Sequence, residues 1–163
     1  MILIDNDMRG IVDSAKLGFV ATVNPDGSPN LSPKASLRVY DDNHIAFMDI
    51  ASPGTVANLS LNPRIEIAVV DFLRRRGYRF SGSAELHQPG SAVHTWLHEW
   101  LLELNGPGYP AKQAVLVNVE IVRPILSPAY TYGNADEQSL VTQYAATYLR
   151  GTHTTDQAAA DRE

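Results

Sequence analysis

The segment from Ser52 to Arg64, SPGTVANLSLNPR, joins a proline–glycine turn to the start of a short helix, and Lys34 precedes it on a stretch with strand character. Gly54 has no Cβ, so an anion can approach the backbone closely at that point. The free N–H groups and the dipole of a helix N-terminus favour a phosphate. Ser52 or Thr55 can cap the helix, and Lys34 adds a positive charge if its strand lies alongside. These residues predict an anion site.

The same spacing permits a purely structural interpretation. Ser52 would then be a helix N-cap only, and Lys34 a surface lysine. Helix caps are common and phosphate sites are not, so spacing alone leaves both interpretations open.

The elements that position these residues are mostly strands. The pattern predicts strands over 19–23, 30–40, 44–50, 65–70, 78–86 and 115–122, and helices over 7–17, 55–61, 93–104 and 136–149. The sequence NPDG at 24–27 is a strong turn between the first two strands, and Asn62-Pro63 ends the short helix. Hairpins and meanders with helices between them favour a small antiparallel barrel with peripheral helices over a doubly wound parallel sheet.

Composition narrows the class of protein. The 163 residues fit one domain, which we place at 1–150, followed by a disordered tail at 151–163 with little apolar content. A net charge of −5 argues against nucleic acid as a partner, and the lack of cysteine excludes disulfides and thiolate chemistry. No apolar run approaches the length of a membrane span, and the N-terminus does not resemble a secretory signal. We expect a cytoplasmic protein that binds neither membrane nor nucleic acid.

Two further groups of side chains could bind ligands. Arg74, Arg75, Arg76 and Arg79 lie within six positions, and Arg75 or Arg76 could reach a phosphate or an acidic substrate across a dimer. The alternative is a solvated hairpin tip. His94 and His98 share a helical face, but the sequence HTWLHE lacks the third ligand of a metal site. We therefore predict no metal.

The ordered set FVATVNPDGSPNLSPK, HIAFMDI, ANLSLNPRIEIAVVD and YRFSGSAEL resembles the pyridoxamine 5′-phosphate oxidase-like family of FMN-binding split barrels over roughly residues 8–126. The resemblance implies a mainly β (α+β) fold, a six-stranded antiparallel split β-barrel with peripheral helices. It also implies a homodimer with FMN in clefts between the two subunits.

The resemblance assigns roles to individual residues. Lys34 lies at or next to a position where the family often has a cation. Where the family often has Arg-Lys for the FMN phosphate, this sequence has Gly54 and Thr55, so hydroxyls and backbone N–H groups would hold the phosphate and Lys34 would supply the charge. Asn58, one helical turn later, could reach the same group. Ser32 and Pro33 could lie along the isoalloxazine edge through their backbone.

The segment after Val122 differs from that of a true pyridoxamine 5′-phosphate oxidase, whose C-terminal arginine and histidine hold the substrate. In related folds such a segment can cover the flavin from the partner chain. Tyr130 or Tyr132 could do this here, or both could pack on the barrel.

The resemblance predicts an FMN-dependent oxidoreductase that acts on a small organic substrate, with the redox chemistry supplied by the flavin. One alternative is a carrier or sensor that binds flavin or haem without turnover. Another is a reductase that uses the deazaflavin F420. No acid–base residue stands out, so the catalytic residues stay unassigned.

Overall fold

The computed structural model describes residues 3–150, which form seven strands and five helices. In chain order these are α1 (Asn6–Ala15), β1 (Gly18–Val23), β2 (Pro29–Lys34), β3 (Arg38–Val39), β4 (His44–Met48), α2 (Pro53–Leu61), β5 (Arg64–Asp71), β6 (Arg76–His87), α3 (Ala92–Asn105), β7 (Ala114–Leu126), α4 (Pro128–Tyr132) and α5 (Glu137–Arg150). The chain divides into two compact units. Unit 1 holds the described residues up to Val70 together with Gly77–Ile125, and unit 2 holds Asp71–Arg76 and the described residues from Leu126 onward.

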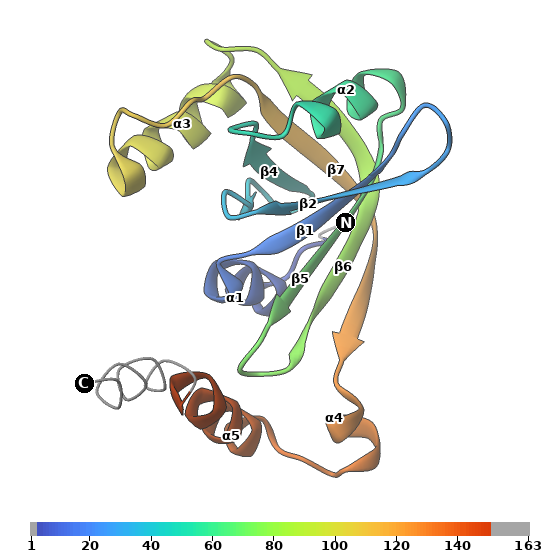
Figure 1. Cartoon of the computed structure of the whole chain (residues 1–163), viewed down its shortest axis with the longest axis vertical. Coiled ribbons are helices and arrows are strands. Elements are labelled where there is room, and N and C mark those ends of the chain that lie inside the picture. Colours follow the sequence, from blue (N-terminus) through green and yellow to red (C-terminus); the bar gives the residue numbers. More distant parts are fainter. Residues whose placement is uncertain (1–2, 151–163) are drawn as a thin grey trace, which may run out of the picture. The chain divides into compact units, whose positions relative to one another are not determined.

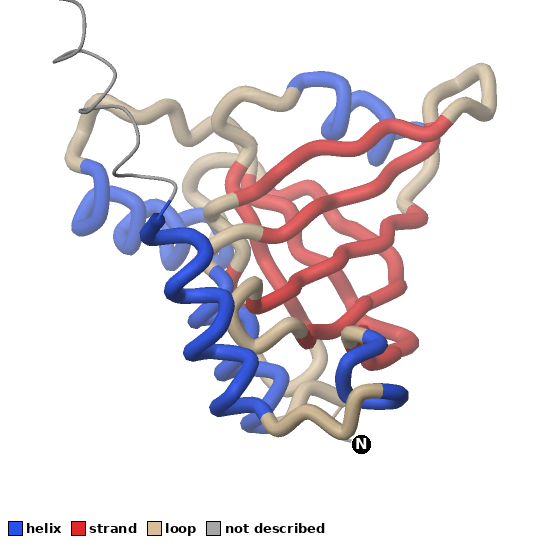
Figure 2. Tube along the Cα trace, turned by 60° about the horizontal axis from the view of Figure 1, so that its bottom comes forward, coloured by secondary structure: helices blue, strands red, loops and turns tan. Residues whose placement is uncertain are grey.

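Unit 1 is built on a curled sheet with strand order β2-β1-β5-β6-β7-β4-β3. β1 pairs antiparallel with β2 and with β5, and β4 pairs antiparallel with β3 and with β7. Figures 1 and 2 show these strands curving around a common interior. The predicted antiparallel split barrel is therefore confirmed.

The curl of the sheet follows from one short connection. β2 and β3 lie at opposite edges of the sheet, yet only residues 35–37 separate them in the chain. Four Cα–Cα steps join Lys34 to Arg38, which span about 14 Å at most when extended. The two edges must therefore approach each other, and the sheet closes into a split barrel at this crossing.

Ser36 holds the crossing in place. It occupies the position opposite Met48 that continues the β3–β4 register of Arg38↔Ala46. The buried Ser36 hydroxyl accepts a hydrogen bond from the Met48 N–H at 3.1 Å, and it contacts the Met48 carbonyl at 3.5 Å. A side-chain hydroxyl thus replaces the backbone partner that a continuous strand would supply.

The interior is filled by the inward-facing residues of the strands and by two helices. Val20, Phe47, Ile67, Phe80 and Val117 are fully buried in the main core cluster. α1 contributes Ile11 and Val12 to this cluster, and α2 contributes Leu59. Figure 1 shows α1 and α2 at opposite ends of the strands of unit 1.

A second core cluster lies between α3 and strands β4 and β7. Val93, Leu97 and Leu101 from α3 pack there against Ala46 and Met48. This packing fixes the tryptophan-bearing helix next to the end of β4, where the crossing also lies.

β6 approaches its neighbours very closely. A Cβ at Gly82 would lie 2.1 Å from the Asn118 carbonyl oxygen, and one at Gly77 would lie 1.9 Å from that of Val69. Only glycine fits at these two positions, because the obstacle in each case is backbone.

The structure corrects several predicted elements. The strand expected over 30–40 is interrupted at the crossing, so the described residues contain seven strands and not six. Residues 128–132 form the short helix α4, which was not predicted, and β7 continues to Leu126. The predicted tail at 151–163 lies outside the described residues. The single domain over 1–150 stays a prediction.

Unit 2 joins the turn between β5 and β6 to the segment after β7. The Asp71 carboxylate accepts hydrogen bonds from the Leu73 and Arg74 N–H groups at 3.0 and 2.9 Å, which shapes the turn. Arg75 has a left-handed φ of 57°. Ser127 N–H donates to the Arg75 carbonyl at 3.0 Å, so the C-terminal segment is tied to this turn.

Candidate functional site

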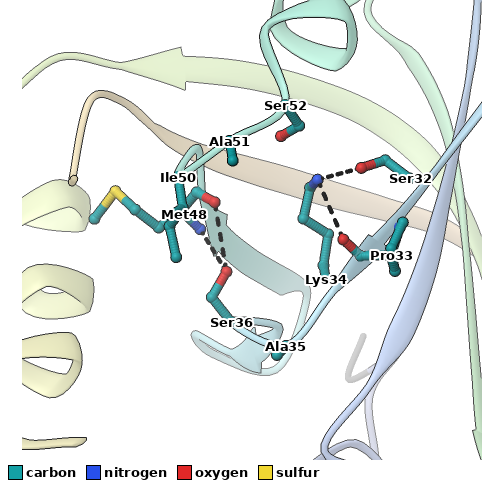
Figure 3. Close-up of a pocket in the computed structure, with 9 residues that line it drawn as sticks. All are labelled: Ser32, Pro33, Lys34, Ala35, Ser36, Met48, Ile50, Ala51 and Ser52. Atoms are coloured by element: carbon teal, nitrogen blue, oxygen red, sulfur yellow. Dashed lines mark hydrogen bonds between the residues drawn. The ribbon is translucent and has the colours of Figure 1, made fainter. Parts of the chain in front are cut away.

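A cavity of about 310 Å³ opens where the two edges of the sheet meet. Its lining comes from the end of β2, the crossing and the segment between β4 and α2: Ser32, Pro33, Lys34, Ala35, Ser36, Met48, Ile50, Ala51 and Ser52. Figure 3 shows the Lys34 side chain extending toward Ser32, on the side of the cavity where Ser52 lies. The structure therefore brings together four of the predicted site residues.

Lys34 is the charged group of this cavity. Alternation along β2 places Ser32 and Lys34 on one face of the strand and Pro33 on the other. The Lys34 ammonium donates to Ser32 Oγ at 2.5 Å and to the Pro33 carbonyl at 3.4 Å, and it lies 5.7 Å from the centroid of the Phe47 ring. Lys34 is buried, which contradicts the alternative interpretation of a surface lysine.

Burial lowers the pKa of Lys34, and the negative charge of Asp49 opposes this shift. Within residues 3–150, no carboxylate forms an ion pair with Lys34. A buried charge without a partner is costly, and an anion in the cavity would remove that cost. An ammonium has three donors, so it can bond an anion in addition to Ser32.

Another part of the cavity wall is the turn that opens α2. Asp49 is buried, and its carboxylate accepts hydrogen bonds from the N–H and the hydroxyl of Ser52 at 3.1 and 3.2 Å. Ser52 occupies the N-cap position, but its side chain makes no cap hydrogen bond. Thr55 lies inside the helix. The expectation that the hydroxyl of Ser52 or Thr55 caps α2 is therefore wrong, because the Ser52 hydroxyl donates its hydrogen bond to Asp49 instead.

Within residues 3–150, the first turn of α2 offers one free backbone donor, the Gly54 N–H, and space around it. Pro53 has no N–H, and among the described residues no acceptor bonds the N–H of Gly54. A Cβ at Gly54 would meet nothing within 4 Å. The turn is therefore open at Gly54, as the sequence predicts.

Thr55 and Asn58 are buried and bonded to the β1–β2 hairpin. The Asn58 amide donates to Thr22 Oγ1 at 3.1 Å and to Asn24 Oδ1 at 2.9 Å. The Asn30 amide donates to Thr55 Oγ1 at 3.4 Å. These bonds hold α2 against the hairpin, and the predicted contact of Thr55 and Asn58 with a cofactor stays a prediction.

The remaining predicted residues, Arg75, Arg76 and Tyr130, belong to unit 2. The Arg76 Nε atom lies 2.5 Å from the Glu137 carboxylate, and the Arg75 guanidinium lies 4.5 Å from the centroid of the Tyr144 ring. The Tyr130 hydroxyl donates to the carbonyl of Arg74. Arg75, Arg76 and Tyr130 thus have partners inside unit 2, and their predicted contact with a cofactor stays a prediction.

Three residues in or next to the cavity were not predicted from the sequence: Ser36, Asp49 and Arg38. Ser36 continues the alternation of Ser32 and Lys34, and that period of two could have identified it. Asp49 precedes Ser52 by three residues, a spacing typical of side-chain caps on turns. Arg38 falls on the same alternation, but its surroundings come from α1 and α3, which no local pattern indicates.

The arrangement suits binding more than proton transfer. One buried ammonium, the Ser32 hydroxyl and an open helix turn can together hold an anionic group. The described residues contain no cluster of three or more histidine, aspartate or glutamate side chains that could hold a metal ion. Within residues 3–150, no helix has the length and apolar character required to cross a membrane.

Fold and cavity together define a split-barrel protein with a lysine-lined cavity at the closure of the barrel. The profile of the family described as pyridoxamine 5′-phosphate oxidase matches residues 4–125. The chain therefore belongs to the pyridoxamine 5′-phosphate oxidase family.

Solved structures agree with this assignment. HupZ from Group A Streptococcus is 32% identical, with 77% of this chain and 96% of that chain covered and a TM-score of 0.68. An FMN-binding protein from Syntrophomonas wolfei subsp. wolfei is 14% identical, with 74% and 84% covered and a TM-score of 0.66. An F420 reductase is 18% identical, with 73% and 98% covered and a TM-score of 0.58. The last two show the fold alone. No curated protein matches the sequence significantly.

Proposed function

We propose that this protein is an FMN-dependent oxidoreductase that acts on a small organic substrate. Membership of the pyridoxamine 5′-phosphate oxidase family and the fold shared with an FMN-binding protein support this function. The observation that carries it is the buried Lys34 ammonium, which lines a cavity and has no carboxylate partner among the described residues.

In this proposal the cavity residues bind and orient the cofactor. Lys34 would provide the charge for the phosphate, and the Gly54 N–H, two residues after the lining residue Ser52, would provide a neutral donor. Bound FMN supplies hydride or single-electron transfer, which no side chain of the protein can perform. The Ser32 hydroxyl accepts a hydrogen bond from the ammonium, and the backbone of Pro33, which lines the same cavity, would lie along the edge of the flavin ring.

The proposal includes a cytoplasmic homodimer with the cofactor at the subunit interface. Arg75, Arg76 or Tyr130 of one subunit would then complete the site of the other. Light scattering after gel filtration tests this part, since a monomeric holoprotein would contradict it.

F420 is a second candidate cofactor. The first turn of α2 reads Pro53, Gly54 and Thr55 and lacks a cationic side chain, and an F420 reductase shares the fold. Both cofactors carry a phosphate group and would use Lys34.

The first experiment is the absorption spectrum of the purified protein, with the mass of any released cofactor. FMN and riboflavin, which lacks the phosphate, are then titrated into the apoprotein and into Lys34→Met, Lys34→Arg and the exposed control Lys112→Met. Loss of a charge-assisted bond worth about 1.5–3 kcal/mol should weaken FMN binding to Lys34→Met at least about tenfold. Riboflavin binding should change little.

Each result bears on a different part of the proposal. Unchanged FMN affinity in Lys34→Met would reject the role of Lys34. Binding of F420 but not of FMN would show that F420, and not FMN, is the cofactor. A protein that binds neither, or that binds FMN but turns over no acceptor, would contradict the proposed enzyme.

A further inference from the structure

Arg38, at the far end of the crossing from Lys34, has an unusual environment. Its guanidinium makes no hydrogen bond and no ion pair within residues 3–150, and its Nε atom is buried without an acceptor. A buried donor without an acceptor destabilises a protein, and a bound partner is one way in which that cost is removed.

Two aromatic rings hold this guanidinium. Its Cζ atom lies 4.8 Å from the centroid of Trp100 and 5.6 Å from that of Trp96, both on α3. Trp96 is itself packed edge-on against Tyr40, with ring centroids 5.0 Å apart. Stacking fixes the position of a planar cation but leaves its N–H groups without acceptors. The protein therefore positions Arg38 without pairing the N–H donors of its guanidinium within the described part of the chain.

Arg38 lines a cavity of about 220 Å³ between the crossing and α1. Its polar lining comes from Arg38 and from Lys16 and Asp13 at the end of α1. Arg38 and Lys16 carry one positive charge each and Asp13 one negative charge, which leaves a single positive charge in excess. Ala35 lines both this cavity and the Lys34 cavity, so the two sites are adjacent.

We propose that Arg38 binds the carboxylate of a small organic acid, and that such an acid is the substrate of the site. This inference rests on the proposed function, in which Lys34 is assigned to the cofactor. A carboxylate matches the planar fork of a guanidinium, and a monoanion matches the single excess charge better than a phosphate dianion does. The apolar body of the acid contacts Leu37, Val12 and Trp100, which complete the lining.

The chain contains two tryptophans, and both contact Arg38, so intrinsic fluorescence reports directly on this site. Benzoate is titrated into the apoprotein, with neutral benzamide as the matched control ligand. We expect saturable binding of benzoate, at least tenfold weaker binding of benzamide, and at least tenfold weaker benzoate binding in Arg38→Met. Arg38→Lys keeps the charge and loses the planar fork of the guanidinium. Its affinity for benzoate should lie between that of the wild type and that of Arg38→Met. Arg64→Met, which removes an exposed arginine, should match the wild type.

Further titrations separate this inference from the proposed function. Lys34→Met should bind benzoate as the wild type does, and benzoate should bind whether or not FMN is present. Benzoate binding that is unaffected by Arg38→Met and Arg38→Lys would overturn the inference. So would competition between FMN and benzoate, or tighter binding of inorganic phosphate than of benzoate. Failure to bind FMN would overturn the proposed function while leaving the carboxylate result standing.

Discussion

The Lys34 ammonium lies 2.5 Å from the hydroxyl of Ser32, two residues earlier on the same face of β2, and both side chains line the cavity at the barrel closure. A hydroxyl satisfies one donor of the ammonium but does not neutralise its charge. Binding of an anion at Lys34 is therefore linked to the protonation of this lysine.

The first prediction concerns pH. Because burial lowers the pKa of Lys34 below its ordinary value of 10.5, the free site loses its proton at a lower pH than an exposed lysine does. A bound phosphate favours the charged form and raises this pKa again. FMN affinity should therefore be constant below the lowered pKa and should fall as pH rises through it. Lys34→Arg should remove the pH dependence, since arginine stays charged. Titrations of FMN into the wild type and into Lys34→Arg across the alkaline range measure the two pH profiles. Identical profiles would contradict the linkage.

The second prediction separates helix stability from anion binding at Gly54. A Cβ at this position meets nothing within 4 Å, so Gly54→Ala fits the fold and should stabilise it by up to about 1 kcal/mol. The added methyl group faces the open turn and should weaken FMN binding. Urea unfolding of this variant measures its free energy of unfolding, and FMN titration measures its affinity for FMN. Unchanged FMN affinity would remove Gly54 from the predicted site.

The third prediction concerns the crossing. Ser36→Ala leaves the buried Met48 N–H without its acceptor and should lower the free energy of unfolding by about 1–3 kcal/mol. Ser60→Ala is the matched control, because that exposed hydroxyl donates only to carbonyls of its own helix, at 2.8 and 3.0 Å. Urea unfolding followed by fluorescence measures both variants. Equal stabilities would show that the Ser36 hydroxyl does not secure the crossing.

The fourth prediction concerns unit 2. Glu137 lies 3.6 Å from the Arg74 Nε atom and 2.5 Å from the Arg76 Nε atom, so one carboxylate links α5 to the turn between β5 and β6. Glu137→Gln removes the charge and should speed tryptic cleavage after Arg150, at the end of α5, and after Arg74 and Arg76 in the turn. High salt should have the same effect on the wild type. Glu103→Gln, in the exposed part of α3, is the control and should be cleaved like the wild type.

The sequence predicted the fold class because strand and helix periodicity is local information. Ile65, Ile67 and Val69 on β5 recur with a period of two and are buried in the structure. The interruption between Lys34 and Arg38 could not be predicted in the same way, since Pro33, the one proline of residues 30–40, lies inside β2 and the break falls two residues later, at Ala35. The break is set by the crossing from one sheet edge to the other, because β2 pairs with β1 whereas β3 pairs with β4.

The candidate site was predictable only in part, for a similar reason. Lys34 and Ser52 were identified from residue type and spacing, and they do line one cavity. The hydrogen bonds of Asn58 to Thr22 and Asn24, 36 and 34 residues away, follow from tertiary packing. The stacking of Arg38 on two tryptophans of α3 likewise depends on where the helix packs, which no local pattern encodes.

Surface connections usually tolerate added residues, but the connection from Lys34 to Arg38 should not. Side chains alternate along a strand, so one inserted residue would rotate either β2 or β3 onto its opposite face. Lys34 or Arg38 would then point away from its cavity, and the inserted length would relax the closure that brings the sheet edges together. In this protein the length of the connection over residues 35–37 thus determines both the diameter of the barrel and the spacing between Lys34 and Arg38.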